Sequence, residues 1–408
     1  MTVTGQPEIT FRLWDLACPD PYPALARLRE RDPVHRTVDG AWLLTRYADV
    51  DRVLRSRSFG APVTKDVVRE MVGTGALFEY MSRRLANYNP PDHTRVRQAM
   101  GHAFIPRRME GLRPWIGRLA DNLLDACPAH AFDLMNAVLH PLPSLVICEL
   151  IGIPEADRHL FAGWTGAIAH LISASLSPGA NLPPDRLQAG EAAAAAFWSY
   201  LEDLIGDRRP ASRNNDLIST LLATVDDHGD RLQKEELIAN IVFLFSAGHQ
   251  TTRDQIGNGL IGMMRHRDQW ERLVADAGLA SQAMEESLRY DASFSLQTRR
   301  ALENVEIDDR RIAAGERVVC ILIAANRDPA RYPEPDRFII DRRDIHPLSF
   351  GGGIHYCLGA PLARIEGEII LRRLVARYPQ LRLAISPEQI EWRNDIVYRG
   401  PRHLPVVA

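Results

Sequence analysis

A short glycine-rich loop that leads into a helix is the feature that most restricts what this chain can fold into. The loop reads Ser349-Phe350-Gly351-Gly352-Gly353-Ile354-His355-Tyr356-Cys357-Leu358-Gly359-Ala360-Pro361. Gly351 and Gly353 can adopt positive φ and let a flat, bulky group approach the backbone, and Pro361 suits the first turn of a helix. Cys357 stands at the start of that helix, where unpaired N–H groups and the helix dipole favour a thiolate. We therefore expect an anionic ligand at Cys357.

The other cysteines do not suggest a different use for this thiol. A single cysteine in a chain of this kind is by default a small buried hydrophobic residue. Cys18, Cys127, Cys148 and Cys320 are far apart and form no Cys-x-x-Cys pair. This spacing argues against both a structural zinc site and a disulfide framework.

Composition predicts one domain spanning residues 1–408. The chain has 46% hydrophobic and 25% charged residues, enough to bury a large core, and shows no compositional break. Its net charge of −3, with dispersed basic residues, argues against nucleic acid as a partner. The first residues lack a basic stretch followed by an apolar run, and the apolar stretch 237–248 falls short of the roughly 20 residues of a membrane span. We expect a cytoplasmic monomer without a membrane anchor.

The hydrophobic pattern predicts a helix-rich α+β fold, with strands near residues 40–45 and 317–323. One helix should run from about Lys234 to Arg265, and some 30 residues would span about 45 Å. Its middle contains Gly248, which costs about 1 kcal/mol relative to alanine, followed by Thr251 and Thr252. Such a local conflict often marks a functional site. The alternative is close helix packing, with threonines bonding back to the i−4 carbonyl.

The pattern Phe350-Gly351-x-Gly353-x-His355-x-Cys357-x-Gly359 resembles the haem-binding loop of the cytochromes P-450. The resemblance implies the fold of that family, mainly α with small β-sheets, and a haem between the long central helix and the helix that follows the cysteine. It implies haem b held by the Cys357 thiolate, whose electron donation favours cleavage of the O–O bond on the distal side. Phe350 would shield the sulfur, and Gly351 and Gly359 would also be among the residues that bind the cofactor.

The middle of the central helix is similar to the distal oxygen-binding helix of the same family. This implies that Thr251 donates a hydrogen bond to bound dioxygen and that Gly248 leaves room for the ligand, with Ala247 as a further residue of the catalytic site. The family usually has Asp or Glu before the threonine, whereas this chain has Gln250. An amide can orient water but cannot transfer a proton as a carboxylic acid does.

Two histidines and two arginines are candidates to hold the haem propionates. His93 and Arg97 are spaced to share one helix face, which in isolation would be an ordinary solvated basic face. The resemblance implies that they bind propionates together with Arg299 and His355, since Arg can bind a carboxylate with two hydrogen bonds. Arg300 is the competing candidate, but alternation along a strand would send it to the opposite face.

The resemblance also implies a structural network of Glu286, Arg289 and Arg337. In the family such residues brace the cysteine loop from below. By itself the Glu-x-x-Arg spacing is weak evidence, because a bare helix pair contributes only about 0.2–0.5 kcal/mol.

The resemblance implies a monooxygenase that hydroxylates or epoxidises a moderate-sized, largely apolar organic substrate, with natural-product biosynthesis as the expected setting. Electrons would come from a separate ferredoxin and its reductase, because the chain has no flavin or nicotinamide fingerprint and no iron–sulfur cysteine cluster. Substrate walls are expected in 60–86, 161–184, 243–247, 291–297 and near Val397, with Arg83 or Arg84 meeting a polar group. Two alternatives stay open: oxidative coupling or peroxide-dependent oxidation, favoured by Gln250, and a haem-binding sensor without turnover.

Overall fold

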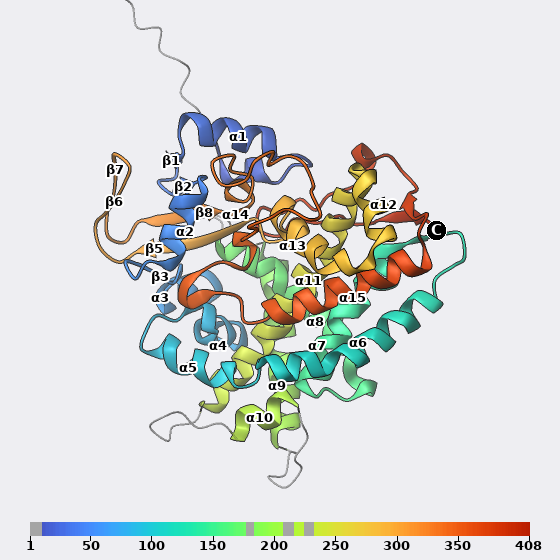
Figure 1. Cartoon of the computed structure of the whole chain (residues 1–408). Coiled ribbons are helices and arrows are strands. Elements are labelled where there is room, and N and C mark those ends of the chain that lie inside the picture. The colour runs from blue at the N-terminus through green and yellow to red at the C-terminus, as the bar shows by residue number, and fades with distance from the viewer. Residues whose placement is uncertain (1–9, 177–182, 207–215, 224–231) are drawn as a thin grey trace, which may run out of the picture.

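The computed structural model describes residues 10–176, 183–206, 216–223 and 232–408. Helices dominate these ranges, and the strands gather into small sheets, the largest at one side of the molecule (Figure 1). The prediction of a mainly α fold with small β-sheets is confirmed. The α-helices are α1 (Tyr22–Arg31), α2 (Tyr47–Arg55), α3 (Lys65–Val72), α4 (Ala76–Arg83), α5 (Asp92–Gly101), α6 (Pro106–Asp125), α7 (Pro141–Ile151), α8 (Arg158–Leu176), α9 (Pro184–Gly206), α10 (Leu217–Ala223), α11 (Lys234–Arg265), α12 (Arg267–Ala275), α13 (Ala280–Tyr290), α14 (Leu322–Ala325) and α15 (Ala360–Arg377).

The strands form sheets of different size. They are β1 (Val34–Arg36), β2 (Trp42–Leu44), β3 (Phe59–Gly60), β4 (Ala131–Asp133), β5 (Leu296–Ala301), β6 (Val305–Ile307), β7 (Arg310–Ile312), β8 (Arg317–Ile321), β9 (Arg382–Leu383) and β10 (Pro405–Val407). The largest sheet has the order β1-β2-β8-β5-β3, and its β2–β8 pair is parallel, with Trp42 opposite Val318. Strand β5 therefore lies inside the sheet and presents residues 296–301 from a fixed backbone.

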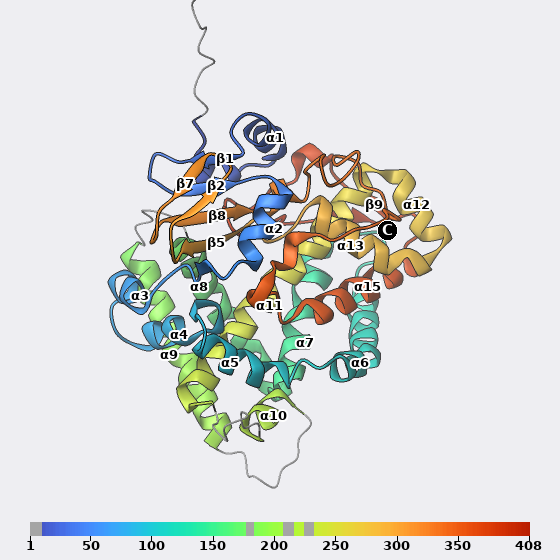
Figure 2. The same cartoon turned by 60° about the vertical axis from the view of Figure 1, so that its left-hand side comes forward.

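The long helix α11 passes through the middle of the molecule and packs against α4, α7, α13 and α15 (Figure 2). Its bounds agree with the predicted segment from Lys234 to Arg265. A capping box starts it, in which the Gln233 N–H donates to the Glu236 carboxylate at 3.1 Å. Nearly all of its length is enclosed by other helices, which explains why apolar residues occur on more than one of its faces.

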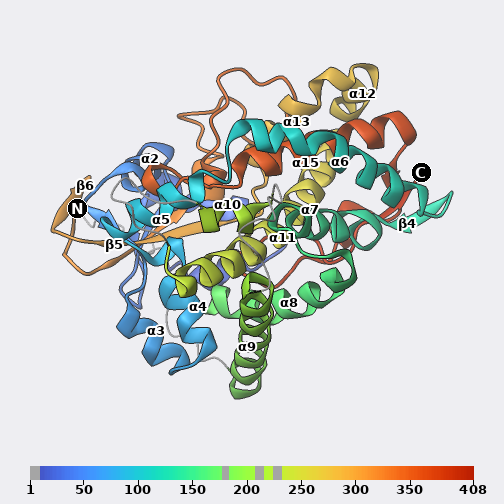
Figure 3. The ribbon, with the colours of Figure 1, turned by 90° about the horizontal axis from the view of Figure 1, so that it is seen from below.

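Two apolar cores hold the chain together. A smaller one lies between the five-stranded sheet and α2, and includes Val50, Val53 and Val318. The larger one fills the helical part, where α15 packs along α6 (Figure 3). Because α15 follows the cysteine loop directly, its burial in the large core fixes the position of Cys357.

We find no helix in the described ranges that combines the length and the apolar character of a membrane span.

Candidate functional site

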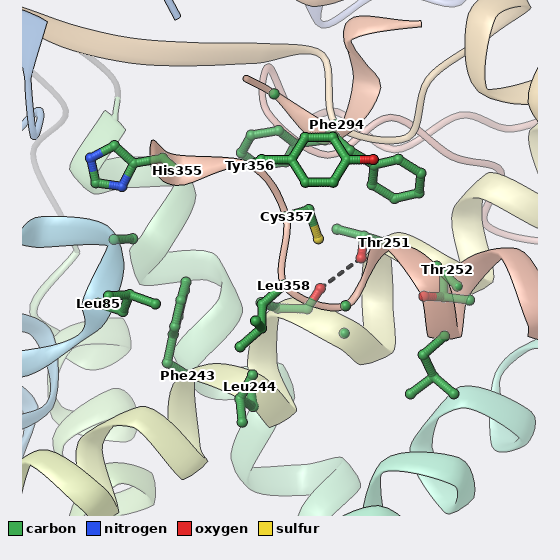
Figure 4. Close-up of a pocket in the computed structure, with 18 of the residues that line it drawn as sticks. Leu85, Phe243, Leu244, Thr251, Thr252, Phe294, His355, Tyr356, Cys357 and Leu358 are labelled. Carbon is green, nitrogen blue, oxygen red and sulfur yellow. Dashed lines mark hydrogen bonds between the residues drawn. The ribbon is translucent and has the colours of Figure 1, made fainter. Parts of the chain in front are cut away.

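A cavity of about 310 Å³ lies where α11, the cysteine loop and the start of α15 meet. Most of the residues predicted for the site border it: His93, Arg97, Ala247, Gly248, Thr251, Arg299, Phe350, Gly351, His355, Cys357 and Gly359. Figure 4 shows the Cys357 sulfur pointing into this space, with Thr251 on the α11 side. Gln250 is not among the described residues that border the cavity.

The cysteine loop is built from short 3₁₀ turns and two glycines with positive φ. The turns are η6 (Leu348–Phe350) and η7 (Gly353–His355), and φ is 70° at Gly351 and 62° at Gly353. Both glycines thus have the positive φ that the sequence predicted. A hydrogen bond from the Cys357 N–H to the Phe350 carbonyl, 2.9 Å long, closes the loop. The thiol is held by the backbone on both sides before α15 begins.

Opposing influences act on the pKa of the Cys357 thiol. Its depth within the protein raises the pKa above the ordinary value, whereas the N–H groups of Gly359 and Ala360 and the charges of Arg97 and Arg364 lower it. Burial dominates, so the helix start favours the thiolate less than expected from the sequence. The side chain is nevertheless accessible, because it borders the cavity. A positively charged metal at the sulfur would shift this balance strongly toward the thiolate.

Four nitrogen-bearing side chains gather at one end of the cavity. The rings of His93 and His355 lie 4.4 Å apart between centroids, and the Nε2 atom of each is buried without a hydrogen-bond partner. Burial and the nearby charges of Arg97 and Arg299 lower the pKa of His93 to about 4 and that of His355 to about 3. Both rings are therefore neutral at pH 7 and can still donate an N–H.

The two arginines of this cluster have no carboxylate partner in the described part of the chain. Arg299 is only 3% exposed and donates to the Thr298 carbonyl at 3.0 Å. Arg300 instead reaches out to the Gly315 carbonyl near the surface, so the alternation argument placed the correct arginine at the cavity. A buried guanidinium at Arg299 and a partly buried one at Arg97, both without a carboxylate partner, suit the binding of an anion.

On the opposite side, α11 supplies a threonine whose hydroxyl is already engaged. Thr251 Oγ1 donates to the Ala247 carbonyl at 2.6 Å, as the dashed line in Figure 4 shows. This is the back-bonding geometry of a helix threonine, and it leaves the oxygen lone pairs free to accept a hydrogen bond. The room at Gly248 is limited, because a Cβ there would meet Ile147 Cδ1 at 2.5 Å.

A buried ion pair of Glu286 and Arg289 braces the loop, but the prediction of Arg337 as a third member of this network is wrong. Glu286 and Arg289 are fully buried and paired at 2.7 Å. Arg337 contributes only its carbonyl, which accepts from Arg289 at 2.9 Å, while its side chain pairs with Glu334 in solvent. Arg342 takes the predicted place, 3.2 Å from Glu286. The sequence offers several arginines within a few residues, and spacing along an irregular loop does not show which one turns inward.

Asn326 is a site residue that the sequence analysis missed. It is fully buried, accepts from the Leu348 N–H at 2.7 Å and donates to Ser349 Oγ at 2.8 Å. Ser349 in turn donates to the Leu288 carbonyl of α13 at 2.5 Å. This chain of hydrogen bonds ties the start of the cysteine loop to the helix that carries Glu286. A single asparagine after an apolar segment gives no sequence signal for that role.

The predicted substrate walls are present in part. Segments 60–86, 243–247 and 291–297 contribute Pro62, Leu85, Phe243 and Phe294, and Tyr398 stands next to Val397. No described residue of 161–184 borders the cavity; residues 177–182 of that segment lie outside the described ranges. Of the two arginines proposed to meet a polar group, Arg84 borders the cavity, whereas Arg83 pairs with Glu79.

The donor set would fit a flat, dianionic cofactor that is also held by one anionic protein ligand. Two unpartnered histidine nitrogens and two uncompensated arginines match a pair of carboxylates, and the thiol lies on the same cavity. Gly351 borders the cavity without a side chain, whereas Gly353 faces α2, where a Cβ would meet the Leu54 carbonyl. These features are those of a haem with propionates and a thiolate ligand.

Comparisons with known proteins agree with this geometry. The family model described as Cytochrome P450 matches residues 64–278 and 274–394. Vitamin D(3) 25-hydroxylase of Pseudonocardia autotrophica is 39% identical over 396 residues, 95% of this chain and 93% of that protein. Mycinamicin IV hydroxylase/epoxidase of Micromonospora griseorubida is 37% identical over 394 residues, covering 93% and 94%. The solved structure of the Bacillus subtilis 168 bacillaene polyketide synthase cytochrome P450 PksS has a TM-score of 0.86 at 33% identity, covering 98% of this chain and 99% of that chain.

Proposed function

This chain belongs to the cytochrome P450 family, and from that premise we propose that it is a haem-thiolate monooxygenase that hydroxylates or epoxidises a moderate-sized, largely apolar organic molecule. The observation that carries the proposal is the convergence of Cys357, two uncompensated arginines and two unsatisfied histidine nitrogens on one cavity. A sensor without turnover would not need the hydroxyl-bearing middle of α11 on the facing wall.

The cofactor in this proposal is haem b. Cys357 would hold its iron through the thiolate, and His93, Arg97, Arg299 and His355 would bind its two propionates. When bound, a thiolate-ligated haem supplies dioxygen activation, because electron donation by the sulfur favours O–O cleavage. The N–H groups of Gly359 and Ala360 point toward the sulfur charge and stabilise it. Phe350 and Gly351 border the same space.

In this proposal, the residues of α11 that face the cavity bind and orient water for proton transfer. Because the Thr251 hydroxyl donates to the Ala247 carbonyl, its oxygen is available to accept a hydrogen bond from a water at the cavity surface. Gln250 can orient a water through its amide but has no proton of ordinary acidity to give. Ala247 and Gly248 border the cavity beside Thr251, and Ile147 fills the space next to Gly248.

The cavity and the relatives support proposals for the substrate class and for the electron source. Phe243, Phe294 and Leu244 give the cavity apolar walls, which suit an apolar molecule. The relatives named as a mycinamicin hydroxylase/epoxidase and a polyketide synthase cytochrome P450 support a role in natural-product biosynthesis. We propose a ferredoxin and its reductase as electron donors, since the sequence carries no flavin, nicotinamide or iron–sulfur motif.

A spectrum of the reduced protein with carbon monoxide tests the proposal first. We expect the red-shifted band of thiolate ligation in the wild type and its loss in Cys357→Ala. Haem content should also fall in Arg299→Leu, because a propionate then loses its counterion. A wild-type protein that binds haem without the red-shifted band contradicts the proposal. A screen for ligand-induced changes in haem spin state would then identify substrates.

Gln250 favours a second candidate, oxidative coupling or peroxide-dependent oxidation without oxygen insertion. The missing acid at this position removes the usual proton donor for oxygen insertion. Mass analysis of the products separates the two candidates: insertion adds one oxygen atom, whereas coupling removes two hydrogens and joins two carbons. Products that gain oxygen contradict the second candidate.

A further inference from the structure

One arginine of the cavity wall, Arg84, lies outside the four-residue cluster proposed to bind the propionates. Arg84 is 3% exposed and borders the cavity, and its Nε atom has no hydrogen-bond partner. No carboxylate pairs with it anywhere in the described ranges. Burying an unpaired guanidinium is unfavourable. The position of Arg84 beside a cavity therefore indicates that an anion from outside the protein binds there.

The position of Arg84 is fixed by the central helix. Asn240 of α11 is fully buried, and its amide accepts from the Leu85 N–H at 2.8 Å and donates to the Arg83 carbonyl at 3.1 Å. Asn240 thus holds the backbone on both sides of Arg84. Because the backbone around Arg84 is already held in place, less conformational entropy is lost there when the side chain binds a ligand. This favours specific binding.

Arg84 lies at a different wall from the propionate cluster. The positive charge of Arg84 acts to lower the pKa of the Tyr398 hydroxyl. Tyr398 borders the cavity and packs on Phe294, with ring centroids 5.7 Å apart. The charges that act on His93 and His355 are those of Arg97 and Arg299, and Arg84 is not among them. The wall of Phe294 and Tyr398 belongs to the proposed substrate space, so a haem propionate is not the expected partner.

We propose that Arg84 binds a carboxylate of the substrate, which makes the substrate class an amphipathic organic acid. A guanidinium fork matches a carboxylate with two parallel hydrogen bonds, and the apolar surroundings strengthen such a pair. The acid would be free, since an ester or thioester at the same carbon carries no charge to pair with Arg84. The apolar body of the acid lies against Phe243 and Phe294. This inference rests on the proposed function, because it takes the cavity to be the substrate site.

Binding of matched acids and primary amides by calorimetry tests the inference. The probes are dodecanoate with dodecanamide, 4-phenylbutyrate with 4-phenylbutanamide, and 1-naphthylacetate with 1-naphthylacetamide, titrated into the haem-loaded protein at pH 7.5. We expect at least one acid to bind the wild type about tenfold tighter than its amide, the gain typical of one charge-assisted pair. Arg84→Gln should remove that preference and change amide binding little.

Arg83→Gln is the matched control, because Arg83 is the neighbouring arginine but pairs with Glu79 and does not border the cavity. It should keep the acid preference. The inference is overturned if no acid is preferred, if Arg84→Gln weakens acids and amides alike, or if Arg84→Gln loses haem, which would make Arg84 a propionate ligand. The carbon monoxide spectrum of the same samples reports on the proposed function separately, since calorimetric acid preference does not depend on the iron ligand.

Discussion

At the scale of single residues, Glu366 is a carboxyl group in an unfavourable position. This residue of α15 is 2% exposed and borders the cavity, and its Oε2 atom has no hydrogen-bond partner in the described structure. Burial without a partner penalises the charged form of a carboxyl group, and it raises the pKa of Glu366 from 4.5 to about 8. The folded protein therefore holds this side chain mainly in its neutral form at pH 7.

The buried Glu366 carboxyl should make stability depend on pH. Between pH 4.5 and about 8 the folded protein keeps a proton that the unfolded chain has released, so stability falls as pH rises through this window. Relative to Glu366→Gln, the wild type should lose about 1.4 kcal/mol per pH unit.

Urea unfolding at several values between pH 5.5 and 8.5 measures this difference in unfolding free energy. Glu303→Gln, a change at an exposed carboxyl, is the control and should run parallel to the wild type. Parallel profiles for wild type and Glu366→Gln would show that the carboxyl is ionised in the folded protein or reaches solvent.

Glu366 also shows which site residues a sequence can and cannot indicate. Because glutamate is rarely buried without a partner, a glutamate in a helix with charged neighbours is expected to be solvated. The burial of Glu366 depends on how α15 packs against the rest of the molecule, which the sequence does not show. The residues found in advance were those in ordered motifs, namely His93, Arg97, Arg299, His355 and Cys357.

At the scale of elements, local patterns predicted α11 and the glycines of the cysteine loop, because both depend on neighbouring residues. What Gly353 touches was not predictable. A Cβ there would overlap the carbonyl oxygen of Leu54, at the end of α2 and about 300 residues away in sequence. The prediction of Arg337 as the third member of the Glu286–Arg289 network was wrong for the same reason. The path of an irregular loop in space, and not the spacing in sequence, brings Arg342 to Glu286.

Gly353→Ala should therefore cost more than a positive φ alone. Gly40 has φ 82°, and a Cβ added there would meet nothing within 4 Å, so Gly40→Ala should cost only the strain of a positive φ, about 1–3 kcal/mol. Gly353→Ala adds an overlap with backbone that cannot rotate away, and should lose at least about 2 kcal/mol more. Urea midpoints and haem retention measure both variants. Equal losses would mean that α2 moves to make room.

At the scale of the whole molecule, the motifs and the hydrophobic pattern predicted the fold class, and long-range polar contacts complete it. Arg399 lies near the end of the chain and is 5% exposed. It pairs with Asp291 at 2.7 Å and donates to the carbonyls of Cys18 and Pro19 at 3.1 and 2.8 Å. Tyr22 also donates to Asp291 at 2.7 Å. No local pattern predicts such a junction, because its members come from three distant segments.

This junction should contribute to global stability as one unit. Arg399→Met leaves Asp291 buried without its cation and should cost about 3–5 kcal/mol, whereas Arg399→Met combined with Asp291→Asn should cost less than the sum of the two single changes. The exposed pair of Arg272 and Asp341, 2.7 Å apart, is the control, and Arg272→Met should cost at most about 1 kcal/mol. Urea unfolding of the four variants measures these terms. Additive losses would mean that Arg399 and Asp291 act independently, and that the two ends of the chain are held to the centre by apolar packing instead.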